Sequence, residues 1–164
     1  MPNFSSEAQI AERFATWLSQ LTGRQYTIKP GGDPPDFLMK PEGWLEVSDI
    51  YLRDEQAKFL NSTAERSSFG FSGPLDETAR RFIAKLDEKL GKQSYEPAYA
   101  QHGKGILLLT CQDCFFDEVN LAQVREALAS FRPTNDHGFF KTAYFEYQLP
   151  GRNRVYDVVY PRKA

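Results

Sequence analysis

The sequence predicts a three-layer α/β/α fold with a mixed central sheet, built as a single domain over residues 1–164. The first observation is that helix-like and strand-like patterns alternate along the chain. The second is the continuous apolar run Gly105–Thr110, polar only at its final Thr, as in a central strand that is buried on both faces. A strand of this kind between helices requires helices on both faces of the sheet. The amphipathic patterns that predict helices cover residues 6–22, 75–92 and 117–131.

The first helix is predicted over residues 6–22. Ser6 and Gln9 have the spacing of a capping box, in which each side chain bonds the other residue's backbone N–H. Gly23 is expected to end the helix, because glycine readily adopts the left-handed conformation found there. Apolar side chains recur at the helical period and form one face, which includes Ile10, Ala11, Phe14 and Leu18.

Two short strands are predicted on either side of the turn Pro41-Glu42-Gly43, namely Asp36–Lys40 and Trp44–Tyr51. A further extended stretch, Gln25–Lys29, precedes them, and a breaker run of proline and glycine separates it from the hairpin. Residues 53–74 are polar and rich in Ser, Gly and Phe, which predicts a long connection. The chain is predicted to end in two aromatic strands, Thr142–Leu149 and Arg154–Tyr160.

The composition is that of a globular protein, with 41% hydrophobic, 14% aromatic and 26% charged residues. It excludes collagen-like, low-complexity and wholly disordered chains. The formal net charge is −2, so no bulk basic field attracts nucleic acid. Any binding to nucleic acid must therefore rest on a local patch.

The sequence also favours a cytoplasmic protein without a membrane segment. No apolar run reaches the roughly 18 residues that a spanning helix needs. The N-terminal residues lack the basic and apolar regions of a secretory signal. Two cysteines do not form a disulfide scaffold, so a reducing compartment is expected.

The hairpin carries the residues that are most informative about chemistry. If Lys40 faces Trp44 across the turn, Asp36 stands opposite Ser48 and is a diagonal neighbour of Glu46. Because strand side chains alternate, Asp36, Glu46 and Ser48 then share one face. Diagonal neighbours lie about 7–8 Å apart at the backbone, from which two carboxylates can close on one cation. Magnesium suits such a pair, since it prefers oxygen ligands and keeps several waters.

Pro35-Asp36 at the start of one strand and Glu46-Val47 on the next resemble the motif of the PD-(D/E)XK nuclease superfamily, which has the restriction-endonuclease-like fold. The resemblance covers about residues 6 to 110 and includes the predicted order of helices and strands. Members often contribute a glutamate from the preceding helix, and Glu7 matches that position as an auxiliary acid. Glu7 is equally an ordinary first-turn acid that the helix dipole favours.

The sequence departs from the family at Ser48, where the catalytic lysine is expected. In some members this lysine has moved to the following helix, and Lys85, Lys89 and Lys92 form a basic stripe on the helix predicted over residues 75–92. Lys85 and Lys89 lie nearest its apolar face, so their long stems can reach over the sheet edge. The spacing of these lysines ahead of Tyr95 resembles such members. The alternative is a solvated flank of the helix.

The resemblance implies a metal-dependent nuclease that hydrolyses phosphodiester bonds in nucleic acid. Asp36, Glu46 and the Val47 carbonyl would hold magnesium or manganese, and the relocated lysine, Lys85 or Lys89, would stabilise the phosphate. The alternative is a catalytically inactive relative that acts as a nucleic-acid or protein binding or regulatory domain. Many members act as dimers, so a homodimer is compatible with the resemblance.

Other motifs point to chemistry less directly. Cys111 and Cys114 have the spacing of a redox pair, but two structural thiols explain them as well. His137 lies in a turn-rich loop, where a solvated histidine is the simpler interpretation. The end of the chain, residues 141–164, carries five Lys or Arg against two acidic residues and is the only net-basic end. Contact with phosphates and a solvated tail both explain it.

Overall fold

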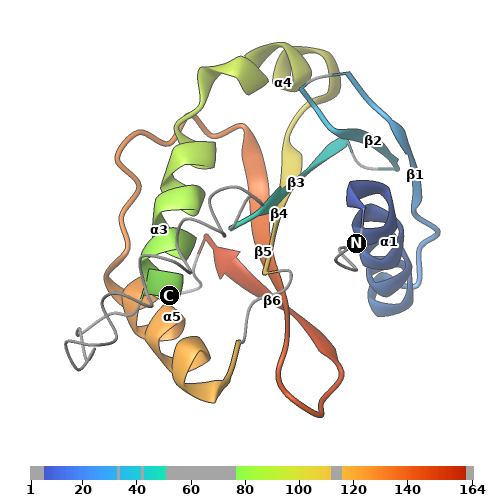
Figure 1. The fold of residues 1–164 in the computed structure, drawn as a ribbon. Coiled ribbons are helices and arrows are strands. Elements are labelled where there is room, and N and C mark those ends of the chain that lie inside the picture. Colours follow the sequence, from blue (N-terminus) through green and yellow to red (C-terminus); the bar gives the residue numbers. More distant parts are fainter. Residues whose placement is uncertain (1–5, 33, 42, 51–76, 112–115, 162–164) are drawn as a thin grey trace.

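A computed structural model describes residues 6–32, 34–41, 43–50, 77–111 and 116–161. Its centre is a six-stranded sheet in the order β1-β2-β3-β4-β5-β6 (Figure 1). The central pairs β3–β4 and β4–β5 are parallel, and the outer pairs are antiparallel. The strands are β1 (Thr27–Pro30), β2 (Phe37–Lys40), β3 (Trp44–Asp49), β4 (Gly105–Thr110), β5 (Phe140–Gln148) and β6 (Arg154–Tyr160).

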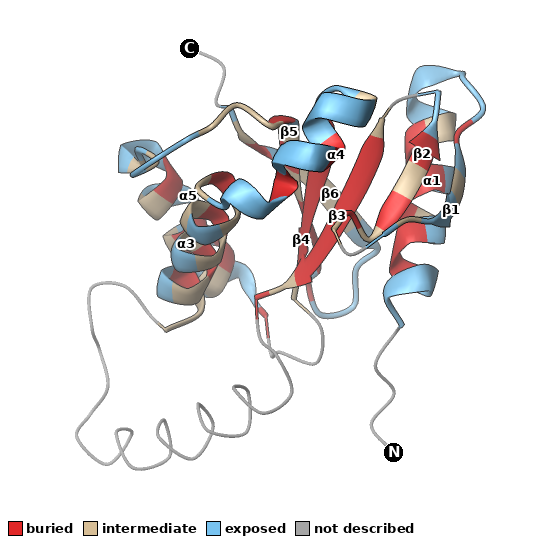
Figure 2. Cartoon of the chain, turned by 90° about the horizontal axis from the view of Figure 1, so that it is seen from above, coloured by how far each residue is buried: buried red, intermediate tan, exposed pale blue. Residues whose placement is uncertain are grey.

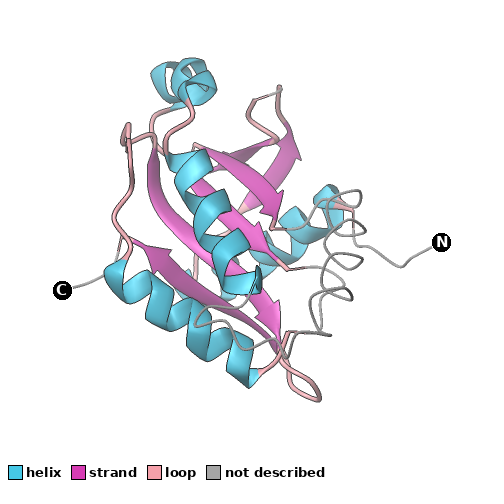
Figure 3. Cartoon of the chain, turned by 60° about the vertical axis from the view of Figure 1, so that its left-hand side comes forward, coloured by secondary structure: helices cyan, strands magenta, loops and turns pink. Residues whose placement is uncertain are grey.

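Helices cover both faces of this sheet, which confirms the predicted α/β class and its mixed sheet. On one face, α1 (Glu7–Thr22) packs against an apolar cluster that includes Val47 and Leu108. On the other face, a second cluster joins the sheet to α3 (Glu77–Leu90), α4 (Glu96–His102) and α5 (Glu118–Ser130). Figure 2 shows β3 and β4 buried between α1 and the pair α3 and α5, and Figure 3 shows α3 and α5 against the same face.

The local signals in the sequence produce the elements that they predict. The Ser6–Gln9 capping box is formed, and Gly23 ends α1 in the left-handed conformation at φ 75°. β4 has the predicted bounds, and all six of its residues are buried, because helices cover it on both sides. Most other element ends differ from the predicted ones by one or two residues.

The predicted register of the β2–β3 hairpin is wrong by two residues. Phe37 pairs with Leu45 and Leu38 with Trp44, so Asp36 comes opposite Glu46 instead of opposite Ser48. Side chains alternate with a period of two, so both registers leave the same residues on the same face. The hydrophobic pattern therefore does not distinguish them. The assignment of Asp36, Glu46 and Ser48 to one face survives the correction.

A short helical stretch between α3 and β4 is not predicted from the sequence. It consists of the 3₁₀ helix η1 (Gln93–Tyr95) followed by α4. Seven residues are too few for a recognisable period, and Pro97 is typical of a helix end as much as of a first turn. This stretch matters for the site because it carries Tyr95.

The predicted connection at residues 53–74 and the residue Cys114 lie outside the described residues. Among the helices that are described, none has the length and apolar character needed to cross a membrane.

Candidate metal and lysine site

Asp36 and Glu46 are held against each other across the start of the β2–β3 ladder. The backbone N–H of Asp36 donates to Oε1 of Glu46 at 3.1 Å. In return, the backbone N–H of Val47 donates to Oδ2 of Asp36 at 3.0 Å. Each carboxylate is therefore fixed by the backbone of the opposite strand, which limits the conformations of both side chains.

The other oxygen of Glu46 faces α3 and η1, where it meets two donors. The Tyr95 hydroxyl donates to Oε2 of Glu46 at 2.8 Å, and Nζ of Lys89 lies 3.7 Å from the same oxygen. The side chain of Lys89 is only 12% exposed, so solvent screens its charge poorly. Lys89 thus faces the buried carboxylate as a partly desolvated cation.

Burial and charge act together on this carboxylate. Glu46 is 7% exposed, and this burial raises its pKa above the ordinary value, with the negative charge of Asp36 as the second cause. The Tyr95 hydrogen bond, the Lys89 charge and the Asp36 N–H oppose the shift. The pKa of Tyr95 is also raised, first by burial and second by the negative charge of Glu46, so its hydroxyl keeps its proton and remains a donor.

Ser48, Lys85 and Glu7 are the other residues that the prediction concerns. Ser48 is buried on the face of β3 that carries Glu46. The ammonium of Lys85 forms its ion pair with Glu88 of the same helix, at 3.7 Å. Glu7 is exposed in the first turn of α1, whose buried residues pack on the opposite face of the sheet. The structure thus brings Asp36, Glu46 and Lys89 together, so that Lys89 is the one of the two predicted lysines that meets the carboxylates. The ion pair of Lys85 is with Glu88, and the buried side chains of α1, the helix that carries Glu7, pack on the other face of the sheet.

The oxygen donors at this point fit magnesium or manganese in type. Asp36 and Glu46 offer carboxylate oxygens, which are the ligands that hard cations prefer. The backbone N–H and C=O of a strand residue point toward the same neighbouring strand. Because the Val47 N–H donates to Asp36, the Val47 carbonyl also points toward β2, on the side of Asp36. No cluster of three or more His, Cys, Asp or Glu with metal-binding geometry occurs within the described part of the chain. The candidate set is therefore two carboxylates and one carbonyl.

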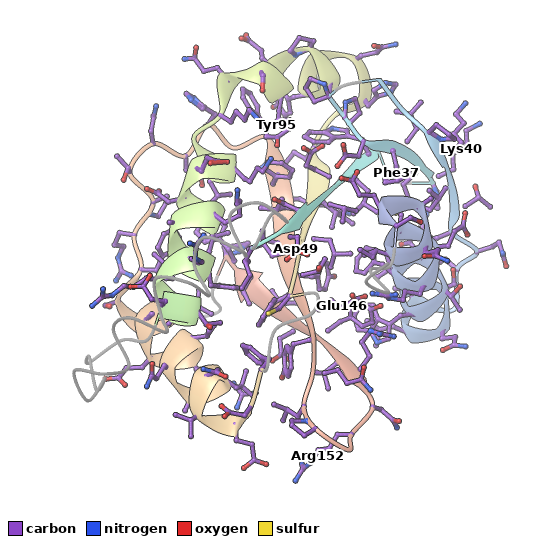
Figure 4. The ribbon with its side chains drawn as sticks, in the orientation of Figure 1. Phe37, Lys40, Asp49, Tyr95, Glu146 and Arg152 are labelled. Carbon is purple, nitrogen blue, oxygen red and sulfur yellow. The ribbon has the colours of Figure 1, made fainter. Side chains whose placement is uncertain are left out.

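Sequence reasoning missed the role of Tyr95 and one further buried acid, Glu146. Glu146 is 1% exposed and lies on the α1 face (Figure 4). Arg13 of α1 binds it with two bonds, from Nη2 to Oε1 at 2.6 Å and from Nε to Oε2 at 3.0 Å. The Tyr156 hydroxyl donates to Oε2 at 2.5 Å. An acidic residue at a core position of an aromatic strand is the signal that could have indicated this cluster.

The remaining candidates have ordinary surroundings. Cys111 is half-buried at the end of β4, and its predicted partner Cys114 lies outside the described residues. The His137 ring stacks on Phe139 with centroids 5.3 Å apart. Two of the basic residues near the chain end form ion pairs, Arg152 with Glu118 at 3.4 Å and Arg154 with Glu146 at 3.8 Å.

Comparisons of the chain with protein-family models, with curated proteins and with solved structures found no match.

Proposed function

We propose that this protein is a metal-dependent nuclease of the restriction-endonuclease-like type, with its lysine supplied by Lys89. The observation that carries the proposal is the 3.7 Å separation between Nζ of Lys89 and Oε2 of Glu46. Lys89 comes from α3, which lies after the two motif strands in the chain, and it reaches the carboxylate face on which Ser48 stands in place of the expected lysine. A mixed sheet with helices on both faces supports the same proposal.

Each residue has a role that follows from its position. Asp36, Glu46 and the Val47 carbonyl would hold magnesium or manganese. When bound, the metal supplies a nucleophilic hydroxide from its water and neutralises charge on the phosphate. Lys89 orients the attacking water or stabilises the negative charge that develops on the phosphate oxygens. Its low exposure makes that interaction stronger than one made in bulk water.

A second candidate is an inactive relative that binds nucleic acid or protein. The observation that favours it is that both oxygens of Glu46 already accept hydrogen bonds, from Asp36 and from Tyr95. In this alternative, the pair Asp36–Glu46 fixes the hairpin and holds no metal.

Incubation of the purified protein with plasmid DNA, single-stranded DNA and single-stranded RNA distinguishes the two. The proposal predicts cleavage of at least one substrate with magnesium or manganese, and loss of cleavage with EDTA, because the metal provides the nucleophile. Gel electrophoresis of the products measures it. A folded protein that cleaves none of them with either metal contradicts the nuclease, and retention of a substrate in a gel-shift assay then supports the binding domain.

A further inference from the structure

We infer that Tyr95 is a positioning residue that holds Glu46 and Lys89 in one fixed arrangement. The inference deepens the proposed function and rests on it. Tyr95 comes from η1, between α3 and α4, and its side chain points into the core (Figure 4). It is 0% exposed, so it does not touch the substrate and acts through its neighbours.

The ring of Tyr95 is immobilised by the aromatic residues around it. Its centroid lies 5.6 Å from Trp44 and 5.1 Å from Phe140, the latter in an edge-to-face contact. Trp44 is itself fixed, because its indole N–H donates to the Gly103 carbonyl at 2.8 Å. A Cβ at Gly105 would lie 2.4 Å from the Trp44 ring, so this packing requires glycine. The hydroxyl of Tyr95 is therefore held at a defined point beside β3.

From that point Tyr95 contacts both members of the candidate site. Its hydroxyl donates to Oε2 of Glu46 at 2.8 Å, while Oε1 accepts from Asp36. Its ring lies 5.9 Å from Nζ of Lys89, within the range of a cation–π contact. A glutamate has three rotatable side-chain bonds, and two donors at opposite oxygens select one conformation. Tyr95 thus sets where the carboxylate and the ammonium stand relative to each other.

The substitution Tyr95→Phe tests this role, since it removes the hydroxyl and keeps the ring. Tyr147→Phe is the matched control, because Tyr147 is also buried and its hydroxyl donates to a carboxylate, Oδ2 of Asp157, at 2.7 Å. Thermal melts over a series of magnesium chloride concentrations measure metal binding. Cleavage kinetics on the substrate of the wild type measure kcat and KM.

Loss of a group that orients a metal ligand costs about 10- to 100-fold in metal affinity or activity. We expect Tyr95→Phe to raise the half-saturating magnesium concentration and to lower kcat by factors in that range. Its KM for nucleic acid stays as in the wild type, because Tyr95 does not reach the substrate. Tyr147→Phe is expected to match the wild type in its half-saturating magnesium concentration, its kcat and its KM. A purely structural hydroxyl would lower only the metal-free melting temperature.

The outcomes separate this inference from the proposed function. One outcome is that the wild type is stabilised by magnesium and cleaves nucleic acid, while Tyr95→Phe shows the same half-saturating magnesium concentration and the same kcat. In that case the positioning role is wrong and the proposed nuclease function stands. If the wild type neither responds nor cleaves, both are wrong. Should Tyr95→Phe fold poorly, the Tyr95 hydroxyl proton in the NMR spectrum of the wild type provides the test. Movement of its resonance with magnesium chloride supports the role, and an unmoved resonance overturns it.

Discussion

Replacing Lys89 with methionine is expected to lower kcat of metal-dependent cleavage by about 100- to 1,000-fold, the usual cost of removing one donor that stabilises transition-state charge. Methionine keeps the unbranched stem and removes the ammonium that lies 3.7 Å from Oε2 of Glu46. The rate constants are measured at saturating magnesium, so that a change in metal affinity does not enter them.

Lys85→Met is the matched control for that experiment. Lys85 lies one turn earlier on α3 and is almost as buried, with 14% of its side chain exposed against 12% for Lys89. Its ammonium pairs with Glu88, so its loss leaves the Glu46 carboxylate unchanged. If the two variants lose the same factor in kcat, Lys89 has no special role in cleavage. The lysines of α3 then belong to a solvated flank of the helix, as in the alternative interpretation.

The largest loss of stability is expected from Arg13→Met, which removes the two-bond cationic partner of buried Glu146 and leaves only the longer contact with Arg154. Breaking a buried ion pair on one side costs about 3–5 kcal/mol in the free energy of unfolding, because an uncompensated charge remains inside. Tyr156 still donates to Glu146 and Arg154 lies 3.8 Å from its Oε1, so the lower end of that range is expected. Urea unfolding with linear extrapolation measures the change.

Arg125→Met provides the comparison. Arg125 pairs with Asp157 at 3.4 Å, but its side chain is 63% exposed. Exposed pairs contribute about 0–1 kcal/mol, since water screens them. An Arg13→Met variant that loses no more stability than Arg125→Met would mean that the Arg13–Glu146 pair does not secure α1 to the sheet.

The parts of the fold that are predictable from the sequence depend on local chemistry or on strict periodicity. The capping box at Ser6 involves residues three apart, and the run Gly105–Thr110 has no polar residue before its end. The shared face of Asp36 and Glu46 follows from the period of two along strands, and it holds in either register. None of these features needs knowledge of distant contacts.

The parts that are not predictable depend on contacts between distant segments. Lys85 and Lys89 differ little in their sequence surroundings, and only the packing of α3 on β3 decides which one meets Glu46. Tyr95 reaches Glu46 across 49 positions of sequence through a helical stretch too short to recognise. Glu146 meets Arg13 across 133 positions. Polar residues in such contacts resemble ordinary surface residues when only the sequence is known.

Thermal melts with and without magnesium chloride, on the wild type and on Asp36→Asn, test the central claim that Asp36 and Glu46 bind a divalent cation. Binding to the native state raises the melting temperature of the wild type at millimolar magnesium. Asp36→Asn loses that response, and its metal-free melting temperature rises slightly, because the charge that opposes ionisation of Glu46 is gone. The asparagine Oδ1 still accepts the Val47 N–H, so the hairpin keeps its bond. A wild type without a magnesium response, or an Asp36→Asn variant that keeps the full response, would contradict the metal site.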